Sequence, residues 1–207
     1  MTYYQNKYFI IIIFIIFIGT KESLSEMDNS TDLINKTSNY LDNINSLKSK
    51  FVQVDQFGNS SSGNLYIKKP GKMRIEYDDP TKILIVVDGF YFIYVDLEID
   101  QATYTDLNES PAKYLLDPKW SFKSNSVKID NVTTNGDLIQ IAIKPSNDSS
   151  EENLTFIFKD NPLELRQWKI VDSQNNSVTV TLYDIEVNKN IDLELFKYQD
   201  KSVFEKN

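Results

Sequence analysis

The chain has 207 residues and a formal net charge of −8 at neutral pH, and it contains no cysteine and no histidine. The absence of these side chains excludes catalysis by a Cys nucleophile or a Ser-His relay, zinc sites built from His and Cys, and the usual haem ligands. Nucleic-acid binding needs clustered cations, whereas this chain has two arginines, Arg74 and Arg166, and scattered lysines. We therefore expect no metal, no cofactor and no nucleic-acid partner.

The N-terminus has the organisation of a secretory signal peptide. Lys7 supplies a positive charge, Tyr8 to Ile18 is an apolar run of eleven residues, and Ser23-Leu24-Ser25 places small residues before a cut ahead of Glu26. A retained membrane anchor is the alternative, but eleven helical residues cross only about half of a hydrocarbon core of roughly 30 Å. The sequence predicts a signal peptide at 1–25, cleaved near Ser25/Glu26, and one exported domain at 26–207.

An amphipathic helix is predicted at the start of this domain. Ser30 or Thr31 can cap its N-terminus, and polar residues such as Asn35, Asp42 and Lys50 occupy its opposite face. Steps of three and four residues, which follow one side of a helix, connect Leu33, Thr37, Tyr40, Leu41, Ile44, Leu47 and Phe51.

After Phe51 the apolar period changes to two residues, which is typical of antiparallel strands. Turn sequences such as Pro70-Gly71, Asp88-Gly89 and Asn135-Gly136-Asp137 separate the alternating segments. The predicted strands are 51–57, 65–69, 73–77, 83–87, 91–95, 99–105, 127–132, 138–143, 154–158, 165–171 and 178–185.

A short helix interrupts the strands. Ser110-Pro111 has the order of an N-cap followed by an N1 proline, Ala112 to Leu116 is good helix sequence, and Pro118 ends it. Ten or eleven strands with two amphipathic helices favour a mainly β fold with a helical lid. We expect an incomplete, strongly curved antiparallel β-barrel, covered on its concave face by short α-helices.

The stretch from Gly63 to Pro80 allows side chains to be assigned to faces of the sheet. Strand alternation places Lys69 on the same face as Leu65 and Ile67, so a cation lies at the edge of an apolar face. Its ammonium either bends out to water past Pro70 or donates to a segment that covers the mouth of a cavity. The inward face is predicted to consist of Leu65, Ile67, Met73, Ile75 and Tyr77.

Several motifs follow one another in a characteristic order. They are Phe51-Val52-Gln53, Gly-x-Leu-x-x-x-basic-Pro at Gly63–Pro70, Tyr77 before Pro80, Asp88-Gly89, Asp100-Gln101-Ala102-Thr103, and Pro-x-x-x-Leu-Leu at Pro111–Leu116. Their order and spacing resemble the outer-membrane lipoprotein carrier protein (LolA) family, the periplasmic shuttle of Gram-negative bacteria.

The resemblance implies an incomplete barrel lidded by helices around an apolar cavity. It implies a periplasmic carrier, not an enzyme, that takes the acyl chains of lipoproteins from an inner-membrane ABC transporter and hands them to an outer-membrane receptor. We expect this chain to be a monomer with these partners. The expected lipid-binding residues are Leu41, Ile44, Leu47, Leu65, Ile67, Met73, Ile75, Tyr77, Tyr114 and Leu115.

This chain departs from the family pattern at Lys69, Met73 and Ile75. The family's residue before the proline is typically Arg, implied to hydrogen-bond the lid closed, and Lys69 stands there. In that role, its ammonium should donate to backbone carbonyls in segment 40–44 or 111–116. Met73 and Ile75 replace residues that are commonly aromatic in the family.

Two other functions remain open. Catalysis by paired carboxylates would have to use Asp78-Asp79 or Glu151-Glu152, but adjacent strand residues point to opposite faces, and both pairs are typical of turns or solvated loops. A lipid- or lipoprotein-sensing module of the same fold, without a shuttle role, is the closer alternative.

Overall fold

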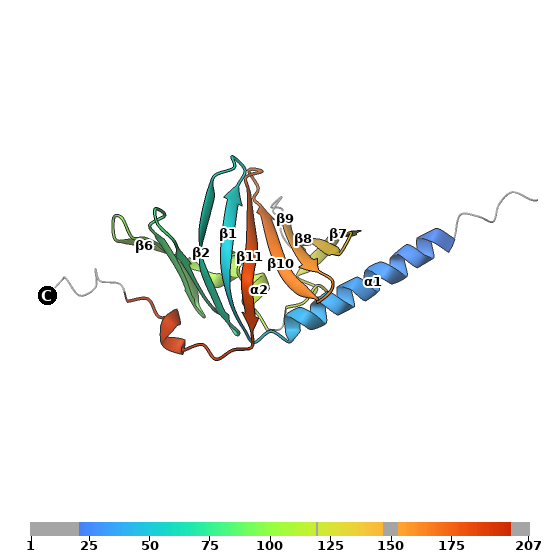
Figure 1. The fold of residues 1–207 in the computed structure, drawn as a ribbon, viewed down its shortest axis with the longest axis horizontal. Coiled ribbons are helices and arrows are strands. Elements are labelled where there is room, and N and C mark those ends of the chain that lie inside the picture. Colours follow the sequence, from blue (N-terminus) through green and yellow to red (C-terminus); the bar gives the residue numbers. More distant parts are fainter. Residues whose placement is uncertain (1–20, 119, 147–152, 200–207) are drawn as a thin grey trace, which may run out of the picture.

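The computed structural model of the chain describes residues 21–118, 120–146 and 153–199. Figure 1 shows one curved sheet with a long helix, α1 (Lys21–Asp42), and a short one, α2 (Lys113–Leu116). Two 3-10 turns, η1 (Leu107–Glu109) and η2 (Leu193–Phe196), accompany them. The strands are β1 (Ser46–Asp55), β2 (Ser60–Lys68), β3 (Lys72–Tyr77), β4 (Ile83–Asp88), β5 (Tyr91–Asp96), β6 (Gln101–Asp106), β7 (Val127–Asn135), β8 (Leu138–Pro145), β9 (Asn153–Lys159), β10 (Glu164–Val171) and β11 (Ser177–Val187).

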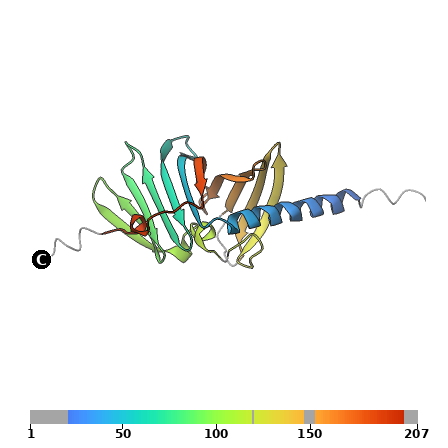
Figure 2. The same cartoon turned by 60° about the horizontal axis from the view of Figure 1, so that its bottom comes forward.

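The strands form a single antiparallel sheet with the order β6-β5-β4-β3-β2-β1-β11-β10-β9-β8-β7. All neighbouring strands are consecutive in the chain except the central pair, β1 and β11, which joins the two halves of the sheet. β6 and β7 are free edges, so the curved sheet stays open (Figures 1 and 2). The predicted fold class is therefore confirmed, and each predicted strand overlaps an observed one, although several boundaries differ.

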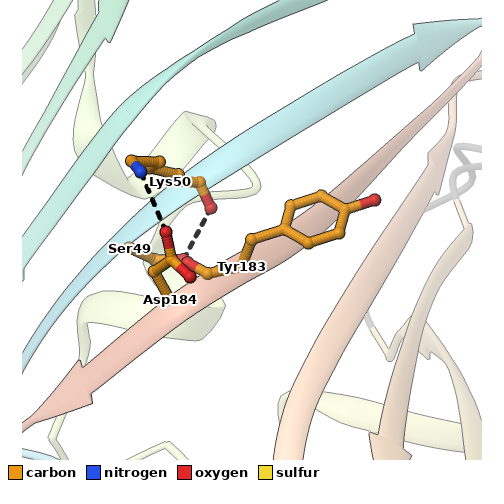
Figure 3. Close-up of polar contacts among 4 residues, drawn as sticks. All are labelled: Ser49, Lys50, Tyr183 and Asp184. Carbon is orange, nitrogen blue, oxygen red and sulfur yellow. Dashed lines mark hydrogen bonds and ion pairs between the residues drawn. The ribbon is translucent and has the colours of Figure 1, made fainter.

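Three β-bulges bend this sheet. In the central pair the register shifts at Ser49, whose buried hydroxyl donates to the carbonyl oxygen of Tyr183 at 2.7 Å. Next to it, Lys50 pairs with Asp184 at 2.9 Å, and Asp184 has a φ of 50° (Figure 3). Further register shifts lie at Asp130 and Arg166. Because a bulge increases local twist and bends its strand, these positions explain the curvature.

The boundary predicted between the first helix and the first strand is wrong. α1 ends at Asp42, so Ile44 lies in the connection after it and Leu47 lies on β1. The error has a simple cause. Leu47 and Phe51 are four residues apart, a spacing that fits one face of a helix and one face of a strand equally well.

α1 also begins before the predicted cap at Ser30 or Thr31. The predicted apolar run of the signal peptide, Tyr8 to Ile18, lies outside the described residues, and the predicted cut near Ser25/Glu26 falls within α1. Among the helices of the described part, none is long and apolar enough to cross a membrane. The division into signal peptide and exported domain stays a prediction.

The C-terminal half of α1 is fastened to the β9–β10 half of the sheet. The Tyr40 ring lies edge-on to Phe158 with centroids 6.0 Å apart, and its hydroxyl accepts a hydrogen bond from the Leu165 amide at 3.2 Å. Lys36 forms an ion pair with Asp160. In Figures 1 and 2 the N-terminal part of α1 extends beyond the sheet.

The largest apolar core fills the concave side, and a smaller cluster lies on the outer face of β4 and β5. η2 lies over β3 and β4, and the Arg74 guanidinium donates to the Leu195 carbonyl at 3.2 Å. The C-terminal segment, to which the sequence assigned no role, therefore covers this outer cluster. The cluster consists of Val86, Ile93 and Val95, with Leu84, Ala102 and Tyr198 packed against it.

Candidate functional site

A cavity of about 200 Å³ lies between the concave face and the segment that contains α2. Side chains of β1 to β5 and of β9 to β11 line it, so both halves of the sheet contribute. The lining residues are Phe51, Gln53, Leu65, Met73, Ile75, Tyr77, Ile85, Phe92, Ser110, Pro111, Ala112, Leu115, Leu154, Trp168, Ile170, Val178 and Val180.

The cavity wall is mainly apolar. Apolar cavities of about 150 Å³ in other proteins bind benzene, so the volume here admits part of one acyl chain. A longer chain requires the covering segments to move. Hydrophobic contacts are non-directional, which suits a site that must accept chains of different shape.

Five of the predicted lipid-binding residues line this cavity: Leu65, Met73, Ile75, Tyr77 and Leu115. The other five, Leu41, Ile44, Leu47, Ile67 and Tyr114, are buried in the same apolar core but do not line the cavity.

Tyr114 lies on the other side of α2, where it lines a second, more polar pocket of about 570 Å³ together with Lys113, Asp117 and Trp120. Ser110, Pro111, Ala112 and Leu115 line the apolar cavity instead. The α2 segment therefore separates the two spaces.

Sequence reasoning missed the contribution of β10. The bulge at Arg166 shifts the alternation, so the inward residues after Leu165 are Trp168 and Ile170, not Gln167 and Lys169. Trp168 pairs with Phe156 and Ile170 with Leu154, both inward-facing residues of β9. No sequence signal marked this bulge.

One hydrogen bond joins two polar groups of the cavity wall. The Tyr77 hydroxyl donates to Oε1 of Gln53 at 2.8 Å, and the Tyr77 ring lies edge-on to Phe51 with centroids 5.2 Å apart. Burial, assisted by the nearby Tyr94, raises the pKa of the Tyr77 phenol, while the bond to Gln53 opposes that shift. At neutral pH the phenol is therefore a hydrogen-bond donor.

Lys69 makes a contact of the kind that the family resemblance implies for a lid-closing residue. Its Nζ donates to the carbonyl oxygen of Leu41 at 2.9 Å, in the last turn of α1. This carbonyl is one of those that a helix leaves unpaired at its C-terminus, where a cation also interacts well with the helix dipole. Burial lowers the pKa of Lys69, and the nearby carboxylates of Asp42 and Asp117 counteract that shift.

The turn between β2 and β3 holds both helices. Besides the Lys69 contact with α1, the amide of Gly71 donates to the carbonyl of Leu116 at 3.0 Å, in α2. Ser110 acts as a local cap, since its hydroxyl accepts from the Ala112 amide at 3.2 Å, although α2 itself begins only at Lys113. α1 and the α2 segment, of which the α2 segment lines the cavity, thus meet at one turn.

The one carboxylate pair within the described residues, Asp78-Asp79, lies in an exposed turn. There Asp78 accepts a hydrogen bond from Ser62 and Asp79 pairs with Lys82. Glu151-Glu152 lies outside the described residues. No group of three or more potential metal-ligating side chains occurs within residues 21–118, 120–146 and 153–199.

Comparisons with known proteins agree with this architecture. An outer-membrane lipoprotein carrier protein of Azotobacter vinelandii is 24% identical over 176 residues, which cover 80% of this chain and 83% of the relative. The "uncharacterized protein RP864" of Rickettsia prowazekii is 25% identical over 182 residues, covering 88% and 84%. A crystal structure of a DUF1329 family protein from Desulfovibrio piger superposes with a TM-score of 0.51 at 8% identity, covering 83% and 97%, which shows likeness of fold alone.

A family model described as "Outer membrane lipoprotein carrier protein LolA" matches residues 42–199. This match includes all strands from β1 to β11 and the whole lining of the cavity. On this evidence the chain belongs to the LolA family of outer membrane lipoprotein carrier proteins.

Proposed function

We propose that this protein carries lipoproteins through the periplasm with their acyl chains in the cavity on the concave face. It receives them from an inner-membrane ABC transporter and releases them to an outer-membrane receptor. The observation that carries the proposal is the apolar cavity between the sheet and α2, in a chain that matches the carrier family over residues 42–199.

The physical need for such a carrier is large. Each CH₂ group of an acyl chain contributes about 0.8 kcal/mol when it leaves water, so a lipoprotein with several chains requires cover to cross an aqueous space. The LolA family is a family of carriers and not of enzymes. A carrier of this kind binds through apolar area and releases its load to a better acceptor.

We call α1 and α2 together the lid. Because the cavity of about 200 Å³ takes only part of one chain, loading requires the lid to move. The hydrogen bonds from Lys69 to Leu41 and from Gly71 to Leu116 then break. In this proposal the lid-closing residue is Lys69, which favours the closed, empty state over the open one.

A charge on the cavity wall tests the proposal. Ile75→Glu places a carboxylate in the cavity at a half-buried position. It should disturb the fold less than Met73→Glu, because Met73 is only 3% exposed. We expect loading with purified lipoprotein to fall by about tenfold or more, since an unpaired carboxylate among apolar groups costs several kcal/mol. Circular dichroism checks that the variant stays folded.

The matched control is Lys169→Glu, on the exposed side of β10 between two residues that line the cavity. The outward Glu76 is less suitable, because it pairs with Arg74 at 2.6 Å and Arg74 also holds Leu195. Equal loading of the Ile75→Glu and Lys169→Glu variants would show that acyl chains do not enter this cavity. Loading without transfer to the receptor would favour a sensing module.

A further inference from the structure

Gln53 carries an amide in a wall that is otherwise mainly apolar. It lies on β1 two residues after Phe51, so strand alternation points both side chains to the concave face, and both line the cavity. A polar group in such a wall costs free energy unless it is hydrogen-bonded. An apolar residue at this position would serve a purely hydrophobic cavity better.

The contacts of Gln53 leave one end of its amide available. The Tyr77 hydroxyl donates to Oε1 at 2.8 Å, which assigns the carbonyl end of the amide to Tyr77. Within the described part of the chain, Nε2 has no acceptor at hydrogen-bonding distance. Tyr77 is itself held by its edge-on contact with the buried Phe51. The NH₂ group is thus oriented in advance and unpaired, at the wall of the cavity.

We propose that Nε2 of Gln53 donates a hydrogen bond to the carbonyl oxygen that joins a bound acyl chain to the rest of the lipid. This inference rests on the proposed function and adds a polar specificity to it. An acyl chain ends in an ester or amide carbonyl, which loses its hydrogen bonds to water when the chain enters an apolar site. The Gln53 amide replaces them and fixes the position of the chain's polar end.

A comparison of lipids that differ in one carbonyl tests this role. The probes are 1-lauroylglycerol, which has an ester carbonyl, 1-O-dodecylglycerol, which has a CH₂ in its place, and the corresponding N-acyl amide. Trp168 lines the cavity, and a Trp120→Phe background leaves it as the single tryptophan, so its fluorescence reports binding. Affinities are measured for the reference protein and for Gln53→Leu, Tyr77→Phe and Gln140→Leu, all in this background.

The ratio of ester to ether affinity should fall by about tenfold in Gln53→Leu, the effect of one hydrogen bond to an otherwise unpaired carbonyl. The amide probe should respond in the same way if N-linked chains use the site, and should bind unchanged if only ester-linked chains do. Tyr77→Phe should lower the ester-to-ether ratio less than Gln53→Leu does, because it keeps the Gln53 amide and removes only the group that orients it. Gln140→Leu, on a strand residue that does not line the cavity, should leave the ratio unchanged.

An ester-to-ether ratio that is the same in Gln53→Leu and in the reference protein overturns the inference. Gln53 would then serve only as the structural partner of Tyr77, and its loss would weaken both probes equally. Failure of the reference protein to bind any probe would instead contradict the proposed function.

Discussion

Replacing Lys69 by leucine should loosen α1 from the sheet. The substitution removes the hydrogen bond of 2.9 Å to the Leu41 carbonyl and leaves a shorter, apolar side chain at this position. A hydrogen bond from a charged donor contributes about 1.5–3 kcal/mol. The lowered pKa of Lys69 shows that burial of its ammonium costs part of this gain. We expect a net loss of about 1 kcal/mol, or about fivefold in the equilibrium between closed and open lid.

Hydrogen exchange of the α1 amides measures this equilibrium without any lipid. Amides near Leu41 should exchange about fivefold faster in Lys69→Leu, while Lys69→Arg, with its fork of five donors, should keep or slow the wild-type rate. Lys68→Leu is the control, because Lys68 is the adjacent lysine and makes no side-chain hydrogen bond with the described residues. Equal exchange in Lys69→Leu and Lys68→Leu would refute the reasoning.

The same variant separates acceptance of a lipoprotein from its release. Lys69→Leu should still load, but it should transfer its cargo to the receptor more slowly than wild type. In the proposed cycle, the leucine removes the polar contact that stabilises the empty, closed lid. Release at the wild-type rate would leave Lys69 as a lysine with a buried stem and no part in unloading.

Two further predictions concern stability. A Cβ at Gly63 would lie 2.0 Å from the backbone oxygen of Glu76, so Gly63→Ala should lower the free energy of unfolding by about 3 kcal/mol in urea titrations. Gly136→Asn, at a φ of 60° with open space around it, should change this free energy little. Similar losses in the two variants would contradict the close approach of β2 and β3. Burial lowers the pKa of Lys69 below its ordinary value of 10.5, so at a pH between the folded and the unfolded pKa the unfolded chain binds more protons. The difference in unfolding free energy, wild type minus Lys69→Met, should therefore rise from neutrality toward about pH 10. A difference that does not change with pH would contradict the buried position of Lys69.

The faces of β2 and β3 could be predicted because nothing interrupts their alternation. Leu65 pairs with Ile75, and Ile67 with Met73, so these predicted inward residues lie side by side across regular registers. The same rule fails on β10, where the bulge at Arg166 reverses the parity before Trp168. A bulge depends on the pairing of two strands, so a single strand's sequence does not reveal it.

There is a second reason why only half of the predicted lipid-binding residues line the cavity. Alternation assigns side chains to faces, but it does not say which strands are neighbours when they lie far apart in sequence. Phe51 pairs with Leu182 through the central contact of β1 with β11, which brings Val178 and Val180 into the wall. This long-range pairing depends on how the two halves of the sheet join, whereas local parity places Lys69 at the edge of the apolar face and the family resemblance implies its contact with a helix.

In the proposed carrier, lid closure and lipid burial act against each other. Beside the Lys36–Asp160 ion pair and the contact of Tyr40 with Phe158, three hydrogen bonds contribute to lid closure: those from Lys69 to Leu41, from Gly71 to Leu116 and from Leu165 to Tyr40. At about 1 kcal/mol each, they stabilise the closed state by about 3 kcal/mol. Burial of about four CH₂ groups offsets this amount, since each contributes about 0.8 kcal/mol. A lid tied by many more bonds would exclude the chains, and one tied by none would leave the apolar cavity open to water.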